Sequence, residues 1–227
     1  MAVAVLFDLE DTLVQTPWSD FQHVIEFRRN TREKLVELGI PRSELEGIER
    51  ATLMRNKASE YIEKHFTAAE KERLQQEMEV FLSRYELDSA RKSKLFPDTI
   101  PTLEELKRLK VRTGLVTNTS SKAVEIVFQL HGLKRYFDVV ITRENVARLK
   151  PNPEGILHAV KKLGAERFFM VGDLSLDAQA AKSAKGTSII IKRNPDGKLD
   201  FQTDHAIQSL GSVLSIIQVA LKSKPSS

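Results

Sequence analysis

The stretch that decides the fold lies near the start of the chain and reads Val3-Ala4-Val5-Leu6-Phe7-Asp8-Leu9-Glu10-Asp11-Thr12-Leu13-Val14. Its apolar, β-branched first half predicts a buried strand. The three carboxylates that follow are costly to bury unless they are paired or bind a metal. We therefore expect Asp8 and Glu10 to lie at the carboxyl end of a parallel strand, where open α/β sheets bind ligands. An ordinary polar loop is the alternative.

The composition is that of a soluble globular protein, with 41% hydrophobic and 29% charged residues. The absence of cysteine excludes disulfides and thiolate metal sites, and it fits a reducing cytoplasm. The first residues do not resemble a signal peptide, and no apolar run reaches membrane-spanning length. The net charge of +4 is interspersed with acidic residues. We therefore expect a cytoplasmic protein with no nucleic-acid or membrane partner.

Residues 18–95 have a hydrophobic pattern of helical period and no convincing strand. Gly39 is expected to end a first helix, and Thr67 with Glu70 forms a capping box before another. This stretch predicts an inserted helical bundle. A further capping box is expected at Thr102, before a helix that leads into the next strand.

From residue 111 the pattern alternates between strands and helices, which predicts βαβ units and a parallel sheet. The fold class is therefore α/β with a helical insert after the first strand. We expect strands at 113–117, 138–141, 168–172 and 188–191, helices at 121–130, 153–163, 175–184 and 210–221, and a turn at 194–197.

Polar residues that packing does not need follow three of these apolar segments. Thr117 and Asn118 open a helix whose free amides form a ready anion site, although an ordinary cap is the alternative. Lys150 lies between stiffening prolines, and a solvated lysine is its alternative. Asp173 ends a strand and Asp177 lies one helical turn on, so both can face one point. A helix cap and a surface acid are their alternatives.

Taken in order, these sites resemble the four motifs of the haloacid dehalogenase superfamily, here Asp8-x-Glu10-Asp11-Thr12, Thr117, Lys150-Pro151-x-Pro153 and Gly172-Asp173-x-x-x-Asp177. The resemblance implies a Rossmann-like catalytic core formed by residues 1–17 and 96–227. It also implies a helical cap at residues 18–95 that closes over the site. Glu10 departs from the pattern, because most phosphatases of the superfamily have Asp there.

The resemblance further implies a phosphatase that hydrolyses small phosphate monoesters through an aspartyl-phosphate, with Mg²⁺ as cofactor. Asp8 would be the nucleophile, and Glu10 the general acid and then the general base. The metal ligands would be Asp8, the Glu10 backbone carbonyl and Asp173, with Asp177 acting through a metal-bound water or through Lys150. The phosphoryl oxygens would be held by Thr117, the Asn118 amide and Lys150.

Other activities of the same superfamily stay open at this point. A 2-haloacid dehalogenase does not need a carboxylate at position 10, so Glu10 favours a phosphatase. A phosphosugar mutase would share the whole site. A catalytically weak binding or scaffold module is an alternative of another class, and the unusual length of Glu10 supports it. The expected partner is a small phosphorylated metabolite, and the expected state is a monomer or homodimer.

Overall fold

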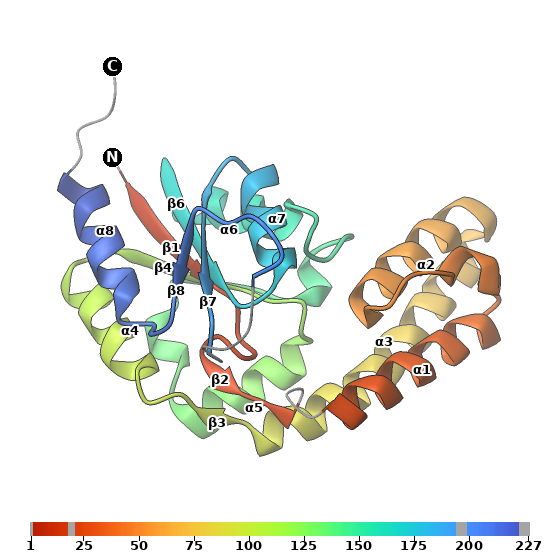
Figure 1. Cartoon of the computed structure of the whole chain (residues 1–227). Helices are drawn as coiled ribbons and strands as arrows, with labels where there is room; N and C mark the ends of the chain where they lie inside the picture. The colour runs from red at the N-terminus through yellow and green to blue at the C-terminus, as the bar shows by residue number, and fades with distance from the viewer. Residues whose placement is uncertain (1, 18–20, 194–198, 223–227) are drawn as a thin grey trace.

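The computed structural model describes residues 2–17, 21–193 and 199–222. It has an α/β core and a helical arm that extends from one side of the core (Figure 1). The arm is formed by α1, α2 and the first part of α3, which follow the first strand in the chain. The turn predicted at residues 194–197 lies outside the described residues.

The core contains a six-stranded sheet in the order β5-β4-β1-β6-β7-β8, and every neighbouring pair is parallel. The first strand is central, with β4 on one side and β6 on the other. The chain first adds β4 and β5 on one side of β1 and then adds β6, β7 and β8 on the other side. The point beside β1 where this direction changes is a topological switch point, and open α/β sheets bind ligands in the crevice there. The strands are β1 (Val3–Phe7), β4 (Arg112–Val116), β5 (Val139–Ile141), β6 (Arg167–Gly172), β7 (Thr187–Ile191) and β8 (His205–Ile207).

Helices cover both faces of the sheet, which explains the unbroken apolar run of β1. Val3, Val5 and Phe7 pack on one face, and Ala4 and Leu6 pack on the other. The first face is covered by α4 (Thr99–Arg108), α5 (Ser121–His131) and α8 (Ser212–Lys222), and the second by α6 (Glu154–Leu163) and α7 (Ser175–Ser183). Short 3-10 turns lie at η3 (Lys134–Tyr136) and η4 (Arg143–Asn145).

The inserted helices have a hydrophobic core of their own, separate from the two beside the sheet. The long helix α3 leaves this arm and packs its C-terminal part against α5 of the core (Figure 1). A short antiparallel pair, β2 with β3, joins the two points at which the chain crosses between arm and core. The elements are β2 (Val14–Gln15), α1 (Phe21–Glu37), η2 (Arg42–Leu45), α2 (Ala51–His65), α3 (Ala68–Lys92) and β3 (Lys94–Leu95).

The parallel sheet and the helical insert predicted from the sequence are confirmed. The first helix ends before Gly39, which has φ of 92°, and the Glu70 carboxylate accepts the Thr67 N–H at 2.9 Å. The capping box expected at Thr102 is wrong. That helix begins at Thr99, and the Thr102 hydroxyl donates to the Asp98 carbonyl at 2.7 Å from inside the first turn.

Candidate active site

The carboxyl ends of β1, β4 and β6 meet at the switch point of the sheet, and a polar residue follows each strand. Asp8 follows β1, Thr117 follows β4 and Asp173 follows β6. The Asp8 N–H donates to the Val171 carbonyl at 2.8 Å, and the Thr117 N–H donates to the Ile141 carbonyl at 3.0 Å. Because these amides continue the sheet ladder, both side chains are held on rigid backbone at the edge of the sheet.

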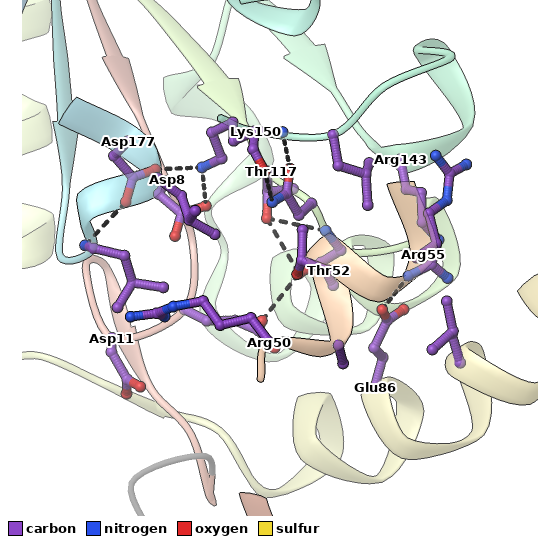
Figure 2. Close-up of a pocket in the computed structure, with 18 of the residues that line it drawn as sticks. Asp8, Asp11, Arg50, Thr52, Arg55, Glu86, Thr117, Arg143, Lys150 and Asp177 are labelled. Carbon is purple, nitrogen blue, oxygen red and sulfur yellow. Dashed lines mark hydrogen bonds and ion pairs between the residues drawn. The ribbon is translucent and has the colours of Figure 1, made fainter. Parts of the chain in front are cut away.

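Lys150 is buried at the site and its ammonium has three acceptors, two of which are labelled in Figure 2. Its ammonium donates to Asp8 Oδ1 at 2.8 Å, to Asp177 Oδ1 at 2.6 Å and to the Val116 carbonyl at 2.9 Å. Only 5% of Lys150 is exposed. Burial opposes the charge, but Asp177 and Asp8 outweigh it and raise the pKa of Lys150. The lysine therefore stays protonated and compensates two carboxylates.

Gly172 allows Asp177 to reach this lysine. A Cβ at Gly172 would overlap the Asp177 carboxylate, so the last residue of β6 must lack a side chain. The second oxygen of that carboxylate, Oδ2, accepts the Leu174 N–H at 3.0 Å. Both oxygens of Asp177 are thus already engaged by protein donors.

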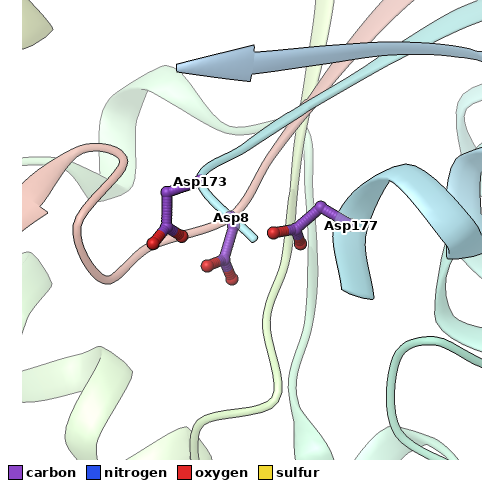
Figure 3. Close-up of side chains that lie close together, drawn as sticks. All are labelled: Asp8, Asp173 and Asp177. Carbon is purple, nitrogen blue, oxygen red and sulfur yellow. The ribbon is translucent and has the colours of Figure 1, made fainter. Parts of the chain in front are cut away.

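Asp8, Asp173 and Asp177 each offer a carboxylate oxygen, and these three atoms lie within 4.8 Å of one another (Figure 3). Burial first, and then the neighbouring charges of Asp177 and Asp8, raise the pKa of Asp173 well above its usual value. A set of hard oxygen donors whose charges repel one another fits a divalent cation such as Mg²⁺. The residues present therefore fit the metal that the family resemblance implies.

Glu10 lies in the loop after β1 and faces the start of α5. Its Oε2 accepts the Thr119 hydroxyl at 3.1 Å. Asp11 next to it has φ of 53°, in the left-handed region that Asp tolerates better than most residues. The Asp11 carboxylate turns back within its own loop and accepts the Thr16 N–H at 3.3 Å. The two neighbouring acids therefore have different surroundings.

A cavity of about 310 Å³ opens between core and arm, and all the predicted site residues line it. These are Asp8, Glu10, Thr117, Asn118, Lys150, Asp173 and Asp177. The arm contributes Arg28, Arg50 and Arg55 to the lining of the cavity, and Figure 2 shows Arg50 and Arg55 there. The sequence pattern does not reveal these arginines, because helical period identifies the buried face of a helix but not the residues that face another part of the chain. Within the described part of the chain, every helix is too short or too polar to span a bilayer.

Several known proteins are similar to this chain over part or all of its length. A pyrophosphatase PpaX of Oceanobacillus iheyensis is 28% identical over 54% of this chain and 59% of its own length. A phosphoglycolate phosphatase of Nitrosococcus oceani is 28% identical over 62% of this chain and 65% of its own. The chain thus spans less than two thirds of these curated relatives.

Solved structures match over nearly the whole chain. A HAD phosphatase of Thermococcus onnurineus has a TM-score of 0.58 at 31% identity, covering 96% of this chain and 98% of its own. A 2-haloacid dehalogenase of Pseudomonas syringae has a TM-score of 0.62 at 23% identity, covering 97% and 100%, which shows a shared fold alone. The family of haloacid dehalogenase-like hydrolases matches residues 3–185, in which all the site residues lie. The chain therefore belongs to the haloacid dehalogenase-like hydrolases.

Proposed function

We propose that this protein is a Mg²⁺-dependent phosphatase that hydrolyses small phosphate monoesters through an aspartyl-phosphate on Asp8. The observation that carries the proposal is the buried lysine that joins Asp8 to Asp177 beside Asp173. An attacking carboxylate needs its charge compensated before it can approach a phosphate dianion, and Lys150 supplies part of that compensation. The phosphatase names of two relatives and one structural neighbour support the same reaction.

The donor set divides into direct and indirect metal ligands. Asp8, Asp173 and the backbone carbonyl of Glu10 would hold Mg²⁺ directly. Asp177 would act through a water, because Lys150 and the Leu174 amide already use both of its oxygens. When bound, the cation supplies positive charge between the Asp8 carboxylate and the phosphoryl oxygens.

The remaining site residues would orient the phosphoryl group and move protons. Thr117, the Asn118 amide and Lys150 would hold the phosphoryl oxygens in line with Asp8. Glu10 would protonate the leaving alcohol oxygen and then take a proton from the water that hydrolyses the acyl phosphate. The Thr119 hydroxyl would keep the Glu10 carboxylate in place for both steps.

The helical insert would serve as a cap. Under this proposal residues 18–95 close over a core formed by residues 1–17 and 96–227, and closure excludes water from the cavity. The separate hydrophobic core of the inserted helices supports a unit that can move as a whole. The absence of cysteine fits a cytoplasmic setting, with a small phosphorylated metabolite as the partner.

The arginines of the cap indicate a substrate with a second anionic group. Arg55 is compensated, because it pairs with Glu79 at 3.1 Å and donates to the Ala147 carbonyl at 2.9 Å. Arg28 and Arg50 also line the cavity, and its lining further includes Thr117, Asn118 and Lys150 of the core. With the phosphoryl group held by the core, these two cations would face the other end of a small substrate.

The names of the relatives agree with this arrangement. Pyrophosphate and phosphoglycolate each carry a second phosphate or carboxylate close to the phosphoryl group that is cleaved, and the two curated relatives bear these substrates in their names. We therefore propose short, doubly anionic phosphate compounds as the substrate class. The cavity volume of about 310 Å³ limits the size of the substrate that can bind.

The activity itself is tested with a panel of phosphate esters and 2-haloacids, assayed with Mg²⁺ and with EDTA. We expect phosphate release that requires Mg²⁺ and that Asp8→Asn abolishes, because an amide is a poor nucleophile and a poor metal ligand. Halide release from 2-haloacids without metal would contradict the proposal and would favour a dehalogenase. An Asp8→Asn variant at near-parental rate would place the nucleophile elsewhere.

The metal assignment is tested by thermal unfolding at pH 7. The pKa of Asp173 is raised in the folded protein. Protonated Asp173 therefore stabilises the fold at a pH below its usual pKa of 3.8, and this stabilisation is lost as the pH rises through the raised pKa. At pH 7 the ionised carboxylate thus carries a stability penalty in the metal-free protein. Asp173→Asn removes that penalty and should raise the Tm of the metal-free protein. Mg²⁺ should raise the Tm of the parent but not of this variant.

Asp177→Asn is the matched control for that measurement. It removes the negative charge that faces the buried Lys150 and leaves this ammonium less well compensated, so it should lower the Tm. A lower Tm for metal-free Asp173→Asn, or an undiminished Mg²⁺ effect on it, would contradict the assignment.

The role of Glu10 is tested by two substitutions at saturating Mg²⁺. Loss of a general acid typically costs ~100- to 10,000-fold in rate, so Glu10→Ala should lose most of kcat. Glu10→Asp should equal or exceed the parent, because it restores the side-chain length usual in phosphatases of this superfamily. Both variants should keep the Mg²⁺-induced shift in Tm, since the metal would use a backbone carbonyl. Parental kcat in Glu10→Ala would exclude Glu10 as the acid.

The second anion is tested by comparing phosphoglycolate with ethyl phosphate, which lacks the carboxylate. Arg50→Gln and Arg28→Gln should each lower kcat/KM for phosphoglycolate about 10- to 100-fold, the range expected for a hydrogen bond to a charged group. Neither should change kcat/KM for ethyl phosphate appreciably. Arg29→Gln is the control, because Arg29 lies next to Arg28 on α1, is exposed and does not line the cavity. Equal losses on both substrates would contradict the second-anion site.

A further inference from the structure

Two asparagine side chains hold consecutive peptide groups at Leu149 and Lys150. Asn118 lies in the core just after β4, and its side chain accepts the Lys150 N–H at 2.9 Å and donates to the Lys150 carbonyl at 3.3 Å. Asn56 makes the same pair of contacts one residue earlier. It accepts the Leu149 N–H at 2.9 Å and donates to the Leu149 carbonyl at 3.0 Å. The backbone that carries the lysine is thus hydrogen-bonded by two asparagine side chains.

The two asparagines come from different parts of the molecule. Asn118 belongs to the sheet edge, whereas Asn56 lies on α2 of the inserted arm, 93 residues away from Leu149 in the chain. Arg55 precedes it and donates to the Ala147 carbonyl at 2.9 Å, so α2 docks on this segment through three side-chain donors and acceptors. The same helix begins beside Arg50, which lines the cavity.

The segment that these asparagines bond, residues 149 and 150, carries the ammonium proposed to act in catalysis. Leu149 and Lys150 are 3% and 5% exposed, so their backbone can shift only if neighbouring groups shift with it. The ammonium makes three contacts at hydrogen-bonding distance, to Asp8, Asp177 and Val116. Displacement of a catalytic group by ~1 Å can cost ~100-fold in rate.

We propose that Asn56 is a positioning residue for Lys150, through which docking of the arm completes the active site. When α2 is docked, its Asn56 fixes the Leu149 peptide and thereby the start of the Lys150 side chain. When α2 is undocked, the core clamp of Asn118 alone holds the lysine. The inference rests on the proposed function in one respect, namely that Lys150 acts in the reaction.

The test compares Asn56→Leu, which keeps the side-chain size but removes both hydrogen bonds, with Asn30→Leu. Asn30 of α1 donates to the Tyr85 hydroxyl of α3 at 2.9 Å, so it controls for loss of an asparagine hydrogen bond that does not involve residues 149 and 150. We expect Asn56→Leu to lower kcat about 10- to 100-fold at a temperature well below its Tm, with a smaller change in KM. Asn30→Leu should keep kcat within about twofold of the parent.

A double substitution shows whether Asn56 acts through Lys150. If it does, adding Asn56→Leu to a Lys150→Met protein should lower the residual kcat of that protein by less than about twofold. The proposal is overturned if Asn56→Leu alone keeps the parental kcat. It is also overturned if Asn56→Leu lowers kcat by the same factor with and without Lys150→Met. Should Asn56→Leu fail to fold, Asn56→Asp keeps the acceptor for the Leu149 N–H and should give a smaller loss in the same direction.

Amide hydrogen exchange keeps the inference separate from the proposed function. The Lys150 N–H donates to Asn118 and not to Asn56, so a purely local effect of Asn56→Leu would leave its exchange rate unchanged. We expect this exchange to accelerate at least about tenfold, because the arm-side clamp supports the same segment. Unchanged exchange at Lys150 overturns the inference whether or not the protein hydrolyses phosphate esters. A parent that is inactive on every ester defeats the proposed function and leaves this measurement valid.

Discussion

The site depends on the buried ammonium of Lys150. Lys150 connects Asp8 after β1 with Asp177 at the start of α7, and it also reaches the carbonyl that ends β4. Burying a charge costs several kcal/mol unless its partners are well placed, so the three strand ends must meet closely for this lysine to be tolerated. The parallel sheet achieves this because its carboxyl ends lie at one edge. The same side chain thus compensates the charge of Asp8 and Asp177 in the fold and takes part in the chemistry proposed for Asp8.

The same constraint explains why the site includes both core and arm. Asn118 of the core and Asn56 of the arm hold the backbone on either side of the bond between residues 149 and 150. The arm also contributes Arg28 and Arg50 to the lining of the cavity that contains the lysine. A single docked helix, α2, can therefore affect both the position of the lysine and the charge that a substrate meets. Arrangements of this kind allow specificity to be coupled to closure.

The sequence was sufficient for the parts of the site that follow strands. A buried parallel strand leaves a long apolar run, and a polar residue just after it stands out, as Asp8, Thr117 and Asp173 do. It was insufficient for β8 and for the pair β2 and β3, because strands of two or three residues are too short to show a period. Asn56 and Arg50 were missed because their roles depend on how the arm docks, and helical period carries no information about docking. The error at Thr102 has a local cause, since Asp98 is the N-cap and the helix begins at Thr99, about one turn earlier than expected.

The most direct test of the account is to trap the covalent intermediate on Asp8. The protein would be mixed with Mg²⁺ and its best phosphate substrate, quenched in acid within milliseconds and digested, and the phosphorylated peptide would be fragmented to locate the modified residue. The account predicts a phosphoryl group on the Asp8 side chain that accumulates and decays with turnover, and none in Asp8→Asn. A phosphoryl group on Asp11 or another residue, or sustained turnover with no phosphorylated peptide at any time, would contradict it.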